Sequence, residues 1–308
     1  MGKRAAYVTL LTKTSYLPGV LVLEYTLRSV GSKYPLVVMV TPSLLQEDRD
    51  ILARRGIGVI DIQSLKPPDR LHELSAHDAR FADTWTKLRA FELTDYDRVV
   101  LLDADMIVMR IMDELMDLSL GRAEIAAAHV CACNPRKLVH YPADWVPENC
   151  AYTPLSHPTG VMNPTLITEK SPRPHTQLNS GLVVLNPSTE LAEAVYNHLY
   201  TSPLVPTWSF PDQDLLSDFF KGRWRPLPWC YNALKTLMLI HKPLWRDEEI
   251  RCLHYILADK PWQARVSKHG GGEYDKSHQW WWDRLELLGV EMMTDNSEDW
   301  KVVLANVA

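Results

Sequence analysis

Two carboxylates stand one residue apart directly after a run of four apolar residues, in the segment Arg98-Val-Val-Leu-Leu-Asp103-Ala-Asp105. Such a run is typical of a strand that is buried on both faces of a parallel α/β sheet. Side chains two apart on an extended chain point the same way. Asp103 and Asp105 should therefore project together from the carboxyl end of the strand, where open α/β sheets bind ligands. Two like charges held this close need a positive partner, and a divalent cation is the simplest one.

The alternative for this tripeptide is structural, because aspartate also favours turns and helix N-caps. Asp-x-Asp alone does not decide between the two interpretations. Its position after a strongly apolar strand favours the metal site.

The elements that position this segment alternate between strand and helix. Strands are expected at residues 5–11, 36–40 and 57–62, with helices at 20–30 and 43–55 between them. Ser43 is the expected N-cap of the second helix, and Gly56 its end. This order predicts parallel pairing through right-handed crossovers. The glycine patterns of dinucleotide-binding and P-loop sites are missing, so neither kind of site is supported.

The chain continues with a helix at 83–93, which carries Lys87, and then the central strand. A short helical segment is expected at 111–118 and strands at 124–129, 178–185 and 250–256, the last carrying His254. Ser188 should cap a helix to about Tyr200, and Pro211 should open another. We expect one catalytic domain over residues 1–265, with a C-terminal extension at 266–308, rich in tryptophan at Trp280-Trp-Trp282, packed on it.

Composition excludes several functional classes. The net charge of −5 without a basic run argues against a nucleic-acid surface. No apolar run approaches the ~20 residues of a membrane span, and the N-terminus does not resemble a signal peptide. Five cysteines, an odd number, fit reduced thiols in the cytoplasm, which is the expected location.

A proline-rich excursion at residues 129–178 lacks periodicity, and a loop of this length inside a compact domain is usually functional. We expect it to cover the sugar or acceptor side. It carries His129, Cys131, Cys133, His140, Cys150 and His157. Their spacing lacks the paired pattern of zinc motifs, so packed or free residues are expected, and a structural zinc site is the alternative.

Six groups of residues follow one another in a specific order: Val8-Thr-Leu10 with Tyr16-Leu-Pro-Gly19, Thr86-Lys87-Leu88, Leu101-Leu-Asp-Ala-Asp105, Asn179-Ser-Gly181, Asp212-Gln213, and His254 with Lys260-Pro-Trp262. This constellation resembles glycosyltransferase family 8, the family of glycogenin and galactinol synthase, over residues 5–262. Tyr34-Pro35, the Pro67-Pro68 loop, the long excursion and Trp280-Trp-Trp-Asp283 look like the galactinol synthase branch.

The resemblance implies an α/β fold of the GT-A type, with a mostly parallel central sheet and helices on both faces. It also implies a UDP-sugar donor, Mn²⁺ with Mg²⁺ as a substitute, and retention of anomeric configuration. The expected activity is transfer of a hexosyl group, by analogy galactosyl, to a small polyol such as myo-inositol or to a saccharide. Family members often form homodimers, and no membrane partner is expected.

Roles carried over by resemblance fall into three sets. The metal ligands would be Asp103, Asp105 and His254. The catalytic residues would be Lys87, Asp212 and Gln213. The donor would contact Leu10, Thr12, Tyr16, Lys87, Asp103, Ala104, Asp105, Asn179, Ser180, Asp212, Gln213, His254 and Lys260. Two positions depart from the family pattern: Leu257 stands where a glycine is usual, and Ser209 stands where glycogenin has an aspartate.

Several alternatives stay open at this point. Retention could proceed through a carboxylate nucleophile, for which Asp212 is the motif-matched candidate, or through same-face attack, which we favour. A glycogenin-like self-glucosyltransferase is the alternative function, although Tyr196, Tyr200 and Tyr231 lie in no context that marks an acceptor. A glycoside hydrolase would need carboxylates ~5–9.5 Å apart on opposite sides of a bond, which Asp103 and Asp105 do not suit. The last alternative is a non-catalytic nucleotide-sugar binder.

Overall fold

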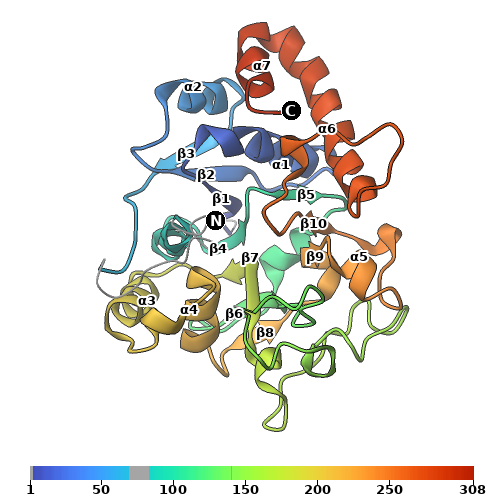
Figure 1. Ribbon diagram of the computed structural model, residues 1–308. Helices are drawn as coiled ribbons and strands as arrows, with labels where there is room; N and C mark the ends of the chain where they lie inside the picture. Colours follow the sequence, from blue (N-terminus) through green and yellow to red (C-terminus); the bar gives the residue numbers. More distant parts are fainter. Residues whose placement is uncertain (1–2, 69–82, 140) are drawn as a thin grey trace.

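A computed structural model describes residues 3–68, 83–139 and 141–308. Its centre is a seven-stranded sheet in the order β3-β2-β1-β4-β7-β6-β8 (Figure 1). The strands are β1 (Ala5–Leu11), β2 (Leu36–Val40), β3 (Gly58–Asp61), β4 (Arg98–Leu102), β6 (Ile125–His129), β7 (Leu178–Leu185) and β8 (Trp224–Pro226). Neighbours pair in parallel except at β7, which runs against both β4 and β6. The predicted mostly parallel sheet is thus confirmed.

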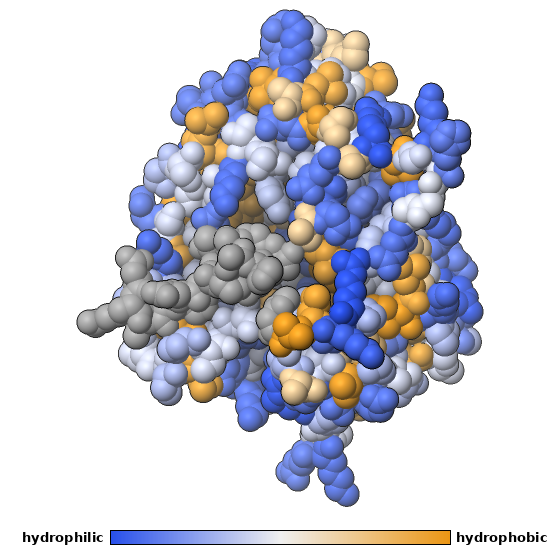
Figure 2. All heavy atoms as spheres, in the orientation of Figure 1, coloured by the Kyte–Doolittle hydropathy of each residue, from blue (hydrophilic) through white to orange (hydrophobic). Residues whose placement is uncertain are grey.

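Helices cover both faces of this sheet, which explains the unbroken apolar run of β4. Val100 and Leu102 join the core beneath α1 (Leu17–Ser29) and α2 (Gln46–Arg54). Val99 and Leu101 join a second core with the 3₁₀ helix η3 (Thr84–Glu92), α3 (Thr189–Thr201) and α4 (Pro211–Phe219). Hydrophilic side chains cover most of the face shown in Figure 2, with small apolar groups between them.

A second, three-stranded sheet extends the domain at the carboxyl end of β4. It consists of β5 (Met106–Val108), β10 (Cys252–His254) and β9 (Ala233–Leu234), in the order β5-β10-β9. The short helix α5 (Leu237–Ile240) follows β9. Because β5 begins just after Asp105, this sheet brings His254 to the same edge as the carboxylates.

The C-terminal segment forms α6 (Asp275–Asp295) and α7 (Ser297–Leu304), which lie beside α1 and α2 (Figure 1). Trp281 and Trp282 are buried in the same core as α1. Arg28 on α1 pairs with Glu291 on α6 at 2.7 Å. In the described part of the chain, no helix combines the length and apolar character needed to cross a membrane.

Two local predictions differ from the structure in detail. The second helix begins at Gln46 after Leu45, not at Ser43, whose hydroxyl instead shares a 2.7 Å hydrogen bond with Thr41. The predicted helix at 83–93 is a 3₁₀ helix. By contrast, the Ser188 hydroxyl accepts from the Leu191 N–H and caps α3 as predicted.

Candidate functional site

The two carboxylates lie in the connection between β4 and β5. The Asp103 N–H donates to the Gly181 carbonyl on β7 at 2.8 Å, so the antiparallel strand holds the start of this connection. On the other side, the Tyr255 N–H donates to the Asp105 carbonyl at 2.9 Å. One donor atom from each of Asp103, Asp105 and His254 lies within 4.8 Å of the others. The predicted metal ligands are therefore brought together.

Each carboxylate divides its oxygens between a lysine and the histidine. Asp103 turns Oδ1 to Lys87 at 2.8 Å and Oδ2 to His254 Nε2 at 3.6 Å. Asp105 turns Oδ2 to Lys260 and Oδ1 to the same Nε2 at 3.3 Å. Two carboxylate oxygens and one ring nitrogen thus converge on one point, and the other oxygen of each carboxylate pairs with a lysine.

A buried amide network fixes the orientation of His254. The Gly181 N–H, which can only donate, points to Asn179 Oδ1 at 3.1 Å. The same oxygen accepts from Asn232 Nδ2 at 2.8 Å, which leaves Asn232 Oδ1 facing His254 Nδ1 at 2.9 Å. Nδ1 therefore carries a ring proton, so in the neutral form of the ring the free lone pair lies on Nε2, which faces the carboxylates. This is the tautomer that a metal-binding histidine needs.

Lys87 is buried, not solvated. Its ammonium contacts Asp103 at 2.8 Å and Asp212 at 2.7 Å. Burial by itself lowers the pKa of this lysine, but the two carboxylates outweigh that effect and raise it above its ordinary value. Lys87 is therefore a fixed positive charge that joins η3, the β4–β5 connection and α4.

Lys260 plays the corresponding part beside Asp105. Its ammonium donates to Asp105 Oδ2 and to the Tyr255 carbonyl, the latter at 2.8 Å. Burial of Asp105 favours the neutral acid, but Lys260 and His254 outweigh it and hold the pKa of that carboxyl well below its usual range. Asp105 is consequently ionised and available as a ligand.

The Tyr-Leu-Pro-Gly motif places α1 directly against the carboxylate connection. A Cβ at Gly19 would lie 2.5 Å from the Ala104 carbonyl oxygen and 3.0 Å from Trp262. Only a glycine allows this approach. Tyr16 meets Trp262 edge to face, with ring centroids 5.3 Å apart, so an aromatic pair stands beside the site.

A cavity of about 840 Å³ contains the whole constellation. Its lining includes every residue that the resemblance assigned to the donor: Leu10, Thr12, Tyr16, Lys87, Asp103, Ala104, Asp105, Asn179, Ser180, Asp212, Gln213, His254 and Lys260. The excursion forms another part of the wall with Cys131, Tyr141 and Trp145. The carboxylates and lysines thus line one part of the cavity, and largely apolar side chains of the excursion line another.

Leu257, which also lines this cavity, has a φ of +78°. The left-handed region suits glycine and strains a leucine. The departure noted in the sequence therefore falls at a position whose backbone conformation calls for glycine.

Sequence reasoning missed Asn232, the fully buried amide that orients His254. It belongs to no motif and lies 22 residues before the histidine. The one feature of the sequence that marks this residue is that the polar pair Tyr231-Asn232 stands directly before an apolar segment.

The chain was compared with known proteins. The model of glycosyl transferase family 8 matches residues 7–265. Galactinol synthase 3 of Arabidopsis thaliana is 31% identical over 91% of this chain and 81% of its own length.

Two solved structures share the fold. The galactosyltransferase LgtC, solved with donor and acceptor sugar analogs, superposes with a TM-score of 0.55 at 16% identity, over 91% of this chain and 95% of LgtC. GlyE of Streptococcus pneumoniae TIGR4 gives 0.58 at 17% identity and 94% of this chain, which spans only 64% of GlyE. The predicted GT-A fold is confirmed, and the chain belongs to glycosyltransferase family 8.

Proposed function

We propose that this protein is a metal-dependent, retaining transferase that moves a galactosyl group from UDP-galactose to myo-inositol or a similar small polyol. The observation that carries the proposal is the convergence of Asp103, Asp105 and His254 in one large cavity, between two buried lysines. Galactinol synthases are the similar curated proteins, and they supply the donor and acceptor of the proposal.

The donor set fits a divalent cation. Asp103 Oδ2 and Asp105 Oδ1 lie 3.6 and 3.3 Å from His254 Nε2, so one ion could take all three atoms as ligands. Mixed carboxylate and imidazole ligands suit Mn²⁺, and Mg²⁺ is the substitute. Asp103, Asp105 and His254 would hold the ion, which supplies Lewis acidity and a template for a diphosphate.

The two lysines would act on the charge of the leaving group. Lys260, anchored to Asp105, provides an ammonium at the diphosphate end of the cavity. Tyr16, at the α1 end, offers a ring face on which the uracil base could stack. Asn179 and Ser180 line the same cavity beside Lys87 and His254, and they carry the polar groups that sugar hydroxyls need.

The pairing of Asp212 with Lys87 supports same-face attack. A carboxylate that nucleophilically attacks a sugar must be free to form a bond, whereas Asp212 is buried and held by the lysine at 2.7 Å. Its negative charge instead stabilises an oxocarbenium-like centre. In this route the bond from anomeric carbon to diphosphate breaks, the acceptor oxygen bonds to the same face, and the departing phosphate takes the acceptor's proton.

The test is release of UDP from UDP-galactose and UDP-glucose, with Mn²⁺, Mg²⁺ or EDTA, and with or without myo-inositol. We expect release that requires the metal and rises sharply with UDP-galactose and inositol. Asp105→Asn should abolish it, whereas Asp61→Asn, at an exposed carboxylate on β3, should not. Metal-dependent release indifferent to inositol would refute the acceptor, and release unaffected by EDTA would refute the site. Transfer of glucose onto the chain itself, seen as a mass increase, would support the self-glucosylating alternative.

A further inference from the structure

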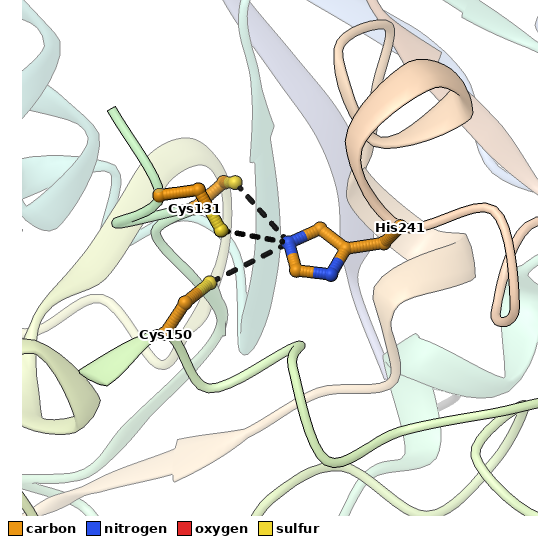
Figure 3. A group of neighbouring side chains, drawn as sticks. Cys131, Cys150 and His241 are labelled. Atoms are coloured by element: carbon orange, nitrogen blue, oxygen red, sulfur yellow. Dashed lines mark hydrogen bonds between the residues drawn. The ribbon is translucent and has the colours of Figure 1, made fainter. Parts of the chain in front are cut away.

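Three of the five cysteines lie together around one histidine. Cys131 and Cys133 follow β6, Cys150 lies in the excursion, and His241 follows α5. Figure 3 shows the thiols pointing at the imidazole from one side. One ligand atom from each of the four lies within 4.8 Å of the others.

All three sulfurs face the same ring nitrogen. Nε2 of His241 lies 3.5 Å from the Sγ of Cys131, 3.3 Å from that of Cys133 and 3.6 Å from that of Cys150. A ring nitrogen has either one proton or one lone pair, so it forms one good hydrogen bond, not three. Hydrogen bonding therefore does not explain this convergence.

A tetrahedral metal ion does explain it. Zn–S bonds of about 2.3 Å and Zn–N bonds of about 2.0–2.1 Å, at tetrahedral angles, put sulfur and nitrogen about 3.5 Å apart. The three observed separations lie within about 0.2 Å of that value. An iron–sulfur cluster would spread its ligands over several iron atoms, so this compact arrangement fits a single ion.

We propose that Cys131, Cys133, Cys150 and His241 bind a structural Zn²⁺ ion. Three thiolates and an imidazole form a common closed zinc set, in which no position is left for substrate. Cys133, Cys150 and His241 are each no more than 6% exposed, as expected for a structural ion. Of the other excursion histidines, His129 bonds the Thr165 carbonyl at 2.8 Å and His157 lies 3.6 Å from Glu249, while His140 is outside the described residues.

The ion would stabilise a segment that has little regular secondary structure. Between β6 and β7 the described residues form only two 3₁₀ helices, Pro147–Asn149 and Arg173–Thr176. Metal binding to such a segment contributes its free energy directly to folding. The four ligands would link two parts of the excursion to His241, directly after α5, which lies 91 to 110 residues further along the chain.

The excursion and α5, which the ion would link, also line the cavity. Cys131, Tyr141 and Trp145 line it from the excursion, and Leu239 and Ile240 line it from α5. On the proposed function, this wall faces the acceptor, because the charged wall holds the donor diphosphate. Loss of the ion should therefore raise the KM for the acceptor more than that for the UDP-sugar.

The decisive measurement is the metal content of the full-length protein, purified under reducing conditions from zinc-supplemented culture and passed over a chelating resin. Elemental analysis should give one zinc per chain. Cobalt substituted for it should show the absorption of tetrahedral Co²⁺ with thiolate charge-transfer bands. A chain with less than a tenth of an equivalent of zinc and no such cobalt spectrum overturns the proposal, as does a disulfide between any two of the three cysteines.

Variants assign the ligands. Cys133→Ser and His241→Ala should each lose at least nine-tenths of the bound zinc, whereas Cys230→Ser, a buried cysteine outside the cluster, should keep it. Equal zinc in all three variants would overturn the assignment. If the ligand variants do not fold, the zinc content and cobalt spectrum of the unmodified chain still decide. Neither readout depends on UDP release, so failure of the zinc site and failure of the proposed function are distinguishable.

Discussion

Gly181 offers a steric probe of the metal site. A Cβ at this position would lie 2.2 Å from His254 Cε1 and 2.5 Å from Nδ1. The imidazole would have to move by about 1 Å to restore ordinary contact, and its bond to Asn232 opposes the movement. Displacing a ligand or its support typically costs 10–100-fold in metal affinity. We therefore expect Gly181→Ala to weaken Mn²⁺ binding by 10–100-fold, which corresponds to about 1.4–2.8 kcal/mol.

The assay is Mn²⁺ binding by titration calorimetry, with the free ion followed by electron paramagnetic resonance. Gly58→Ala is the matched control, because it also adds a methyl group to a strand of the same sheet. There the nearest atom, Val37 Cγ2, is 3.6 Å away, an ordinary contact. This control should bind Mn²⁺ as the unmodified chain does.

A double-mutant cycle separates the clash with His254 from general damage. A His254→Ala background removes the two closest contacts of the added methyl group and leaves only Asn179 Oδ1 at 3.0 Å, so Gly181→Ala should cost little further affinity there. The two effects should therefore be strongly non-additive. Unchanged Mn²⁺ affinity in Gly181→Ala, or the same loss of affinity in both backgrounds, would refute the assignment of His254 as a ligand.

Three further substitutions test single interactions by urea denaturation. Lys87→Met removes the ammonium that neutralises Asp103 and Asp212, so it should destabilise by about 3 kcal/mol. The exposed control Lys301→Met should cost less than about 0.5 kcal/mol. A loss below about 1 kcal/mol for Lys87→Met would contradict the prediction. Leu257 has a φ of +78°, so Leu257→Gly should be more stable than Leu257→Ala by about 1 kcal/mol. Alanine is usually the more stable of these two residues, and equal stabilities would be evidence against backbone strain. Burial, with Asp212, raises the pKa of Asp214 to about 7, although backbone N–H donors and Arg173 act in the opposite direction. The folded state therefore holds a proton that the unfolded state has lost, so the free energy of unfolding should fall by about 2 kcal/mol from pH 5 to 8. Asp214→Asn should remove this pH dependence, and an unchanged pH dependence in the variant would exclude Asp214 as its source.

The features that the sequence predicted well are those encoded locally. The apolar run before Asp103 predicted a strand with two covered faces, and the two core clusters on either side of β4 bear that out. Ser188 was identified as an N-cap because its hydroxyl satisfies an N–H three residues away. Ser43 offered the same signal, but a bond to Thr41 uses its hydroxyl, so the helix starts later. Local competition of this kind is invisible in spacing alone.

The features that could not be predicted depend on contacts between distant segments. Asn232 orients His254 only because β9 pairs with β10. His241 joins the cysteines across 91 to 110 residues, and no periodicity links α5 to the excursion. The four residues form no paired zinc motif for the same reason, since only Cys131 and Cys133 are close in sequence. Tertiary packing brings Cys150 and His241 to them.

The two clusters complement each other in metal chemistry. At nitrogen and oxygen sites Zn²⁺ binds more tightly than Mn²⁺, so the carboxylate cluster by itself would not select manganese. Thiolates prefer zinc strongly over manganese, and the cysteine cluster borders the same cavity through Cys131. A chain that carries both clusters would direct its first zinc ion to sulfur, because three thiolates and an imidazole bind zinc more tightly than two carboxylates and an imidazole. On the proposed function, the carboxylate site would then be left to Mn²⁺ or Mg²⁺, which suit its oxygen ligands and a diphosphate.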